Sequence, residues 1–111
     1  MLNTMKLRAA VGLVLLWGLL ACGSAPDGQA AVAANGKPDG AALYDMYCTL
    51  CHGGDGKLGI NGAKDLTASA LSREEMIAVV THGRNTMAPF KQVLDPGQVE
   101  AVVDHLRTLP K

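Results

Sequence analysis

The distribution of apolar positions separates an apolar start from a later region with helical spacing. Residues 9–20 are apolar apart from Gly12 and Gly18. This run of about 12 residues falls short of the roughly 20 that a membrane-spanning helix needs. Lys6 and Arg8 precede the run, so the start of the chain is typical of a secretory signal.

The apolar run ends in Leu19-Leu20-Ala21-Cys22, which resembles the lipobox of bacterial lipoproteins. The resemblance implies that residues 1–21 are a cleaved signal peptide and that the sulfur of Cys22 is acylated. Acyl chains hold a protein at a membrane, since each buried methylene adds about 0.8 kcal/mol. The expected location is therefore the periplasmic side of a bacterial membrane. An ordinary cleaved signal with a chance cysteine and an uncleaved anchor are the alternatives.

Residues 22–38 are expected to form a flexible tether that begins with the acylated cysteine. The segment is small and polar, it contains Gly and Pro, and it has no apolar period. A coil of this length has an r.m.s. reach of roughly 20–25 Å. A domain on such a tether can turn and meet partners beside the membrane.

The remaining segment, residues 39–111, is expected to be one folded domain with three helices. Helical spacing of apolar residues appears at 40–51, 73–82 and 96–109. Ser72 and Glu75 predict a capping box at the start of the second helix, and Gly83 predicts its end. Asp95 and Pro96 predict the start of the third helix. Because no segment alternates like a strand, the expected fold class is all-α.

The composition indicates that such a small domain has few residues with which to stabilise its fold. Aromatic residues make up only 4% of the chain, so the domain has little bulk with which to build a core. Domains of this size often depend on a disulfide, a metal or a cofactor. The chain has 10 basic and 10 acidic residues, and loss of Lys6 and Arg8 with the signal peptide leaves 8 against 10. This balance does not favour nucleic acid as a partner.

The strongest chemical motif is Cys48-Thr49-Leu50-Cys51-His52, since C-x-x-C-H is the attachment signal for c-type haem. Two thiols on one helical turn can add across the two vinyl groups of a porphyrin, and the adjacent imidazole can then bind the iron. The alternatives are a thioredoxin-like redox pair, half of a zinc site and a structural disulfide. The sequence lacks the βαβ pattern that a thioredoxin-like redox pair requires. It also lacks the second pair of ligands that a zinc site requires.

Residues 40–111 resemble a class I cytochrome c, the group that includes small bacterial and algal photosynthetic carriers. The matching features are Gly40, Tyr44, the haem motif with Gly53, a Gly-rich loop, Gly83, Met87-Ala88-Pro89-Phe90 and a closing amphipathic helix. The resemblance implies an all-α cage of three to five helices wrapped around one covalently attached haem. It also implies that the first and last helices cross closely at Gly40, with Tyr44 near His105 and Leu106.

The chain departs from the family pattern at two places. The family often has an aromatic residue where His105 lies. It also often has a proline in the loop that corresponds to residues 60–66, and the carbonyl of this proline accepts the N–H of the proximal imidazole. A different backbone carbonyl in that loop is expected to take this role here.

Met87 is the expected sixth ligand of the iron, on its position and on the family match. It lies in a loop beside Pro89, which cannot continue a helix. A thioether favours ferrous iron, so His/Met ligation raises the reduction potential. The alternative is that Met87 only fills the core. His82 and His105 are alternative imidazole ligands, for which helix-end or packing roles are expected.

Further residues are expected to surround the haem. Arg84 and Asn85 are expected near a propionate, with surface solvation as the alternative, while Met46 and Met76 are expected in the core or the haem wall. The residues expected to wrap the macrocycle are Leu58, Ile60, Leu66, Leu71, Ile77, Val80, Phe90 and Leu94.

Together these features predict a membrane-tethered carrier of single electrons and not an enzyme. The resemblance implies redox partners, namely a quinol-oxidising complex and a terminal oxidase, a reductase or a photosynthetic centre. A haem-based sensor or enzyme with an open sixth site is one alternative. A fixed subunit of a larger redox complex is the other.

Overall fold

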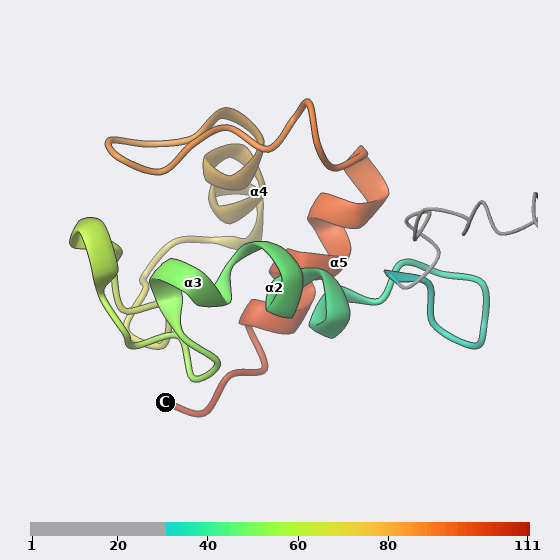
Figure 1. Cartoon of the computed structure of the whole chain (residues 1–111), viewed down its shortest axis with the longest axis horizontal. Helices are drawn as coiled ribbons and strands as arrows, with labels where there is room; N and C mark the ends of the chain where they lie inside the picture. Colours follow the sequence, from blue (N-terminus) through green and yellow to red (C-terminus); the bar gives the residue numbers. More distant parts are fainter. Residues whose placement is uncertain (1–30) are drawn as a thin grey trace, which may run out of the picture.

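The computed structural model describes residues 31–111, which form an all-α domain (Figure 1). The signal peptide and the acylated Cys22 that the sequence predicts lie outside these residues. The described helices are α2 (Gly40–Tyr47), α3 (Thr49–His52), the 3₁₀ turn η2 (Ile60–Gly62), α4 (Arg73–His82) and α5 (Pro96–Leu106). The predicted fold class is confirmed. Across residues 31–111, every helix is too short or too polar to cross a bilayer.

The first predicted helix, at 40–51, is two helices that meet at Cys48. Asp39 caps α2, because its carboxylate accepts from the backbone N–H of Ala41 and Ala42. Cys48 ends α2 with φ −115° and ψ −32°, and it also begins α3. The apolar pattern does not reveal this break, which sets α3 and its haem motif apart from the helix that carries the core.

The start signals of α4 and α5 are confirmed. Ser72 and Glu75 form the predicted capping box, and Asp95 forms a second box with Gln98. The third helix ends at Leu106, before the predicted residue 109. Beyond it the chain turns, and the N–H of Thr108 donates to the carbonyl of His105 at 2.9 Å.

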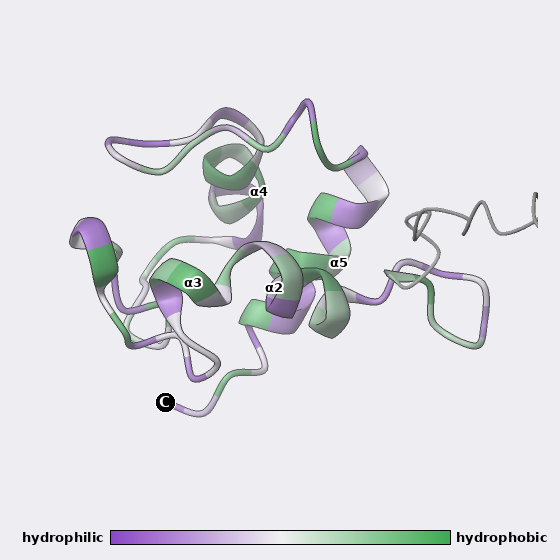
Figure 2. Ribbon diagram, in the orientation of Figure 1, coloured by the Kyte–Doolittle hydropathy of each residue, from purple (hydrophilic) through white to green (hydrophobic). Residues whose placement is uncertain are grey.

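The core forms where α2 crosses α5. In Figure 2 the stretch of α5 beside α2 is hydrophobic, and several side chains at this contact are fully buried. The largest of them are Leu43, Tyr44, Val99, Val102 and Val103. Burial of such side chains contributes about 1.5–3 kcal/mol each. The buried core is small, and most other apolar side chains of the described region are partly exposed to solvent.

Residues 31–38 also pack on the domain. Ala31 is only 3% exposed, and its carbonyl accepts from the N–H of Asp39 at 2.6 Å. A β-bridge between Val32 and Pro38 closes this turn. The packed region therefore includes the last part of the tether expected at 22–38.

An ion pair joins α4 to α5. Arg73 contacts Glu100 at 3.1 Å and Asp104 at 2.7 Å. The guanidinium lowers the pKa of the Asp104 carboxyl through its hydrogen bond. Because these groups are partly exposed to solvent, the two ion pairs contribute little stability.

Gly40 allows the close crossing of α2 and α5, as the family resemblance implies. A Cβ at this position would run into the carbonyl of Ala101 and come within 3.2 Å of the His105 Cβ. We expect Gly40→Ala to destabilise the haem-loaded protein by about 1–3 kcal/mol, because the helices must move apart. The measurement is the denaturant midpoint at unchanged slope.

Gly54→Ala is the matched control, since a Cβ there meets no atom within 4 Å. Its effect is expected to stay within about 0.5 kcal/mol. Equal midpoints for the two variants would show that the helix crossing tolerates a side chain at Gly40.

Candidate functional site

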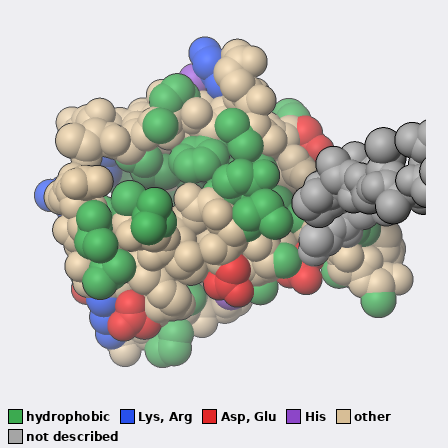
Figure 3. Space-filling model, in the orientation of Figure 1, with side chains coloured by type: hydrophobic (Ala, Val, Ile, Leu, Met, Phe, Trp, Pro, Cys, Tyr) green, Lys and Arg blue, Asp and Glu red, His purple; other side chains and the backbone are tan. Residues whose placement is uncertain are grey.

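A cavity of about 800 Å³ opens between α3, η2, α4 and the segment that follows α4. In Figure 3 hydrophobic side chains gather around a hollow in this face. The volume falls in the range of about 300–1,000 Å³ that is typical of small-molecule and cofactor sites. Apolar side chains that line it include Ile60, Leu66, Leu71, Met76, Val80 and Phe90. Such a lining excludes water from whatever occupies the cavity.

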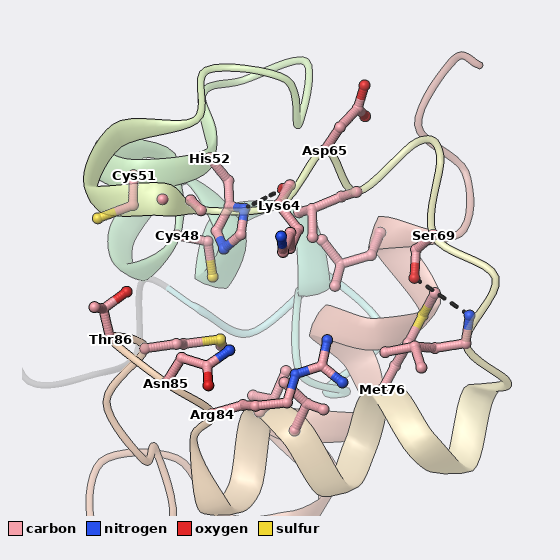
Figure 4. Close-up of a pocket in the computed structure, with 18 of the residues that line it drawn as sticks. Cys48, Cys51, His52, Lys64, Asp65, Ser69, Met76, Arg84, Asn85 and Thr86 are labelled. Carbon is pink, nitrogen blue, oxygen red and sulfur yellow. Dashed lines mark hydrogen bonds between the residues drawn. The ribbon is translucent and has the colours of Figure 1, made fainter.

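The haem motif forms one wall. Cys48, Cys51 and His52 all line the cavity, and the two thiols are free. Figure 4 shows the Cys48 sulfur and the His52 ring pointing from α3 into this space. Burial, and then the neighbouring Cys51, raises the pKa of the Cys48 thiol to about 11. In the chain alone, Cys48 is therefore a neutral thiol at pH 7.

The orientation of His52 is set by one backbone carbonyl. The Nδ1 of its ring lies 3.1 Å from the carbonyl oxygen of Lys64. Because a carbonyl can only accept, Nδ1 is the donor in this pair, and in the neutral imidazole the lone pair is then on Nε2. This tautomer suits the ring for metal binding through Nε2. The carbonyl of Lys64 is therefore the partner of the His52 ring within residues 60–66, where the sequence left the residue open.

Met87 lies on the opposite wall, at the end of a two-residue turn. Arg84 and Met87 exchange backbone hydrogen bonds of 3.1 and 3.0 Å. Gly83 has φ +73° at the base of the turn, where a Cβ would lie 2.5 Å from the Met87 carbonyl. The structure thus brings Met87 to the same cavity as His52.

The other histidines do not reach this cavity. Of the described histidines, His52 alone lines it. His82 is exposed at the end of α4, and His105 packs on Tyr44 with ring centroids 5.3 Å apart. These positions agree with the helix-end and packing roles expected from the sequence.

Most of the expected cavity wall is confirmed, with four corrections. Leu94 is buried in the core, and Ile77 packs against that core. Leu58 and Met46 are 54% and 55% exposed, because both lie on the outer side of their segments. The expected residues that do line the cavity are Ile60, Leu66, Leu71, Met76, Val80, Arg84, Asn85 and Phe90.

Two hydrogen-bond partners at the site could not be named from the sequence. One is Lys64 as the residue whose carbonyl contacts His52, because every residue of the loop carries a backbone carbonyl. The other is the hydroxyl of Thr86, which donates to the carbonyl of Asn61 at 2.9 Å. An Asn-Gly pair such as Asn61-Gly62 favours a turn, but it does not identify the side chain that donates to the Asn61 carbonyl.

Tyr44 supports the motif from the core. Its hydroxyl donates to the carbonyl of Gly53 at 2.6 Å, directly after His52. Burial, then the nearby Cys48, raises the pKa of Tyr44 to about 12, so the hydroxyl keeps its proton at neutral pH. We expect Tyr44→Phe to cost about 1 kcal/mol in the haem-loaded protein, since the Gly53 carbonyl loses its partner.

Tyr47→Phe is the comparison variant, because Tyr47 lines the same cavity and is 36% exposed, and its hydroxyl has no hydrogen-bond partner among residues 31–111. Thermal unfolding of the three proteins is the measurement. An unchanged melting temperature for Tyr44→Phe would show that water replaces the hydroxyl at no cost.

Comparisons with known proteins identify the family. A family model described as "Cytochrome C oxidase, cbb3-type, subunit III" matches residues 35–106. Cytochrome c6 of Aphanizomenon flos-aquae is 40% identical over 73 residues, which is 60% of this chain and 83% of the relative. The chain belongs to the class I c-type cytochromes. Cytochrome c6 of Nostoc is 36% identical over 74 residues, 61% of this cytochrome and 66% of the relative.

The chain is also similar to one solved structure and to part of one longer protein. This cytochrome aligns with the solved structure of "KustC0563 c-type cytochrome" at a TM-score of 0.60 and 34% identity, over 66% of this chain and 99% of that one. It is also 37% identical over 84 residues to dihydro-heme d1 dehydrogenase of Pseudomonas aeruginosa. That match covers 72% of this chain but only 17% of the larger protein.

Family membership implies covalently bound haem c, and the cavity fits it. The site offers two free thiols, an imidazole with its Nε2 lone pair available, a thioether and a mainly apolar lining. This donor set is the one that haem c uses in cytochromes. In residues 31–111, no three His, Cys, Asp or Glu side chains come together as ligands of a bare metal ion. The cytochrome is thus a haem c electron-transfer protein.

Proposed function

We propose that the cytochrome carries single electrons on one haem c held by Cys48 and Cys51, with His52 and Met87 as axial ligands of the iron. The observation that supports this most is the convergence of all four side chains on one cavity. Bound there, the haem supplies the one-electron couple of its iron. The protein supplies ligands, orientation and an apolar enclosure.

The individual residues have separate roles. Lys64 accepts from Nδ1 of His52 and so holds the ring with Nε2 toward the cavity. The Met87 thioether favours the ferrous state and raises the reduction potential. Two filled axial positions leave no coordination site for dioxygen or peroxide. The proposed role is therefore electron transfer in which no substrate binds to the iron.

We further propose that Cys22 is acylated and anchors the domain on the periplasmic side of a bacterial membrane. The lipobox-like ending of the apolar run supports this. Without residues 1–21, the side chains carry 8 basic against 10 acidic residues. The c6 relatives favour redox proteins as partners, such as a quinol-oxidising complex and a terminal oxidase, a reductase or a photosynthetic centre.

The carrier role is tested with exported protein from a host that matures c-type cytochromes. The expected result is a reversible one-electron titration and a ferrous form that does not bind carbon monoxide at neutral pH. A high-spin ferrous form that binds carbon monoxide would instead support a haem-based sensor or enzyme.

The anchor is tested by fractionation of the same cells. Wild type is expected in the membrane fraction and Cys22→Ala in the soluble fraction after cleavage. Labelling with a radioactive or clickable fatty acid is expected for wild type alone. A wild-type protein that is soluble and unlabelled would contradict acylation.

A fixed subunit of a redox complex is the second candidate. The matching family model, which is described as an oxidase subunit, favours it. After mild detergent extraction, a fixed subunit is expected to co-purify with other membrane proteins, whereas a tethered shuttle is expected to purify alone.

A further inference from the structure

The turn that carries Met87 is attached differently at its base and at its tip. At the base, the N–H groups of Phe90 and Lys91 donate to the carbonyls of Val80 and Thr81 in α4, at 3.0 and 3.2 Å. Gly83 lets the returning chain lie against the end of α4. The base of the turn is therefore held by α4 and belongs to one wall of the cavity.

The tip of the turn reaches across to the opposite wall. The Thr86 hydroxyl donates to the carbonyl of Asn61 in η2 at 2.9 Å, and these residues are far apart in the sequence. Among hydrogen bonds of the described region, this one alone links the segment 84–87 to the loop that holds Lys64. Asn61 has φ +53° inside η2, and this left-handed conformation fixes the direction of its carbonyl.

The same loop also contacts His52. Lys64, whose carbonyl orients the His52 ring, follows Asn61 closely, and the N–H of Ala63 donates to the carbonyl of Ile60 at 3.0 Å between them. Segment 60–64 thus connects both proposed axial ligands, His52 through Lys64 and Met87 through Thr86. In Figure 4, His52 and Lys64 lie across the cavity from Arg84, Asn85 and Thr86.

We propose that Thr86 is a positioning residue, whose hydrogen bond to Asn61 keeps the Met87 turn closed over the cavity. The inference rests on the proposed His52/Met87 ligation. If displacement of Met87 from a bound haem iron required the tip of the turn to move away from η2, the Thr86–Asn61 bond would be lost. In that case the bond opposes replacement of Met87 by an external ligand. Thr86 is exposed, so its substitution does not disturb the core.

The test uses the haem-loaded protein and imidazole, which competes with Met87 for ferric iron. Thr86→Val keeps the shape of the side chain but removes the hydroxyl, while Thr86→Ser keeps the hydroxyl. Because one neutral hydrogen bond contributes about 0.5–1.5 kcal/mol, imidazole is expected to bind Thr86→Val about 2-fold to 10-fold more tightly than wild type. Thr86→Ser is expected to bind it like wild type.

A second pair of variants tests the acceptor side. Asn61→Gly keeps access to the left-handed conformation and is expected to bind imidazole like wild type. Asn61→Val disfavours that conformation, moves the carbonyl and is expected to act in the same direction as Thr86→Val. This pair keeps the proposal testable if Thr86→Val does not mature.

Equal imidazole affinities for wild type, Thr86→Val and Asn61→Val would overturn the inference. A ferric wild type that lacks the absorption band of sulfur–iron ligation would overturn both the ligation and this inference. If that band is present and the affinities are equal, only the role of Thr86 falls.

Discussion

Met87→Ala is expected to open the iron of this cytochrome to external ligands. The thioether is lost from the wall opposite His52, and neither His82 nor His105 lines the cavity to replace it. The ferrous variant is expected to be high-spin and to bind carbon monoxide at neutral pH. Its reduction potential is expected to fall, because axial ligands set haem potentials over a range of roughly 0.8 V and the thioether favours the ferrous state.

Two methionines provide controls for Met87→Ala. Met46 is 55% exposed, so Met46→Ala is expected to leave the spectrum and the potential unchanged. Met76 lines the cavity, and Met76→Leu keeps the volume without the sulfur. Carbon monoxide titration and redox titration are the measurements. A low-spin Met87→Ala protein with the potential of wild type would remove Met87 from the ligand set.

Without haem, the domain is expected to be largely unfolded. The described core consists of the eight buried side chains Ala31, Leu43, Tyr44, Val80, Leu94, Val99, Val102 and Val103. Beside this small core lies a mainly apolar cavity of about 800 Å³, and filling it with a covalently held group supplies the missing burial. Such coupling of cofactor binding and folding is known for small metal-binding domains.

The double variant Cys48→Ser/Cys51→Ser, produced in the same host, is the test of this coupling. Its far-UV spectrum is expected to show little helix and no cooperative thermal transition, while the haem-loaded wild type shows both. The single variant Gly54→Ala, which meets no atom within 4 Å, serves as a control for expression and export. A native-like spectrum and a cooperative melt of the double variant would contradict the expectation.

The sequence predicts helix starts well because they depend on local chemistry. The side chains of Ser72 and Asp95 accept from the N–H groups of Glu75 and Gln98 in the first turns of α4 and α5. Pro96 marks the start of α5 because the first helical position needs no N–H donor. The break at Cys48 could not be predicted, since the apolar spacing continues through it. The packing of Ala31 was also missed, because a Gly- and Pro-containing segment carries no apolar period that marks burial.

At the site, the sequence predicts side chains but not backbone partners. Cys48, Cys51 and His52 follow from one motif, and Met87 follows from its place beside Pro89 and from the family match. The Lys64 carbonyl and the Thr86–Asn61 bond depend on how a Gly-rich loop folds. Leu58 and Met46 were expected to point inward but are exposed. Hydrophobicity alone does not tell which side of a loop or helix meets solvent.

The ligand set is tested most directly by the absorption spectrum of the exported protein. Reduced protein is expected to show the sharp bands of a low-spin c-type haem, which remains bound after acid-acetone extraction. Oxidised protein is expected to show the weak long-wavelength band of sulfur–iron ligation, and Met87→Ala is expected to lack it. A colourless protein with both thiols of Cys48 and Cys51 free would contradict the attachment, and a red wild type without the sulfur band would contradict Met87 as the ligand.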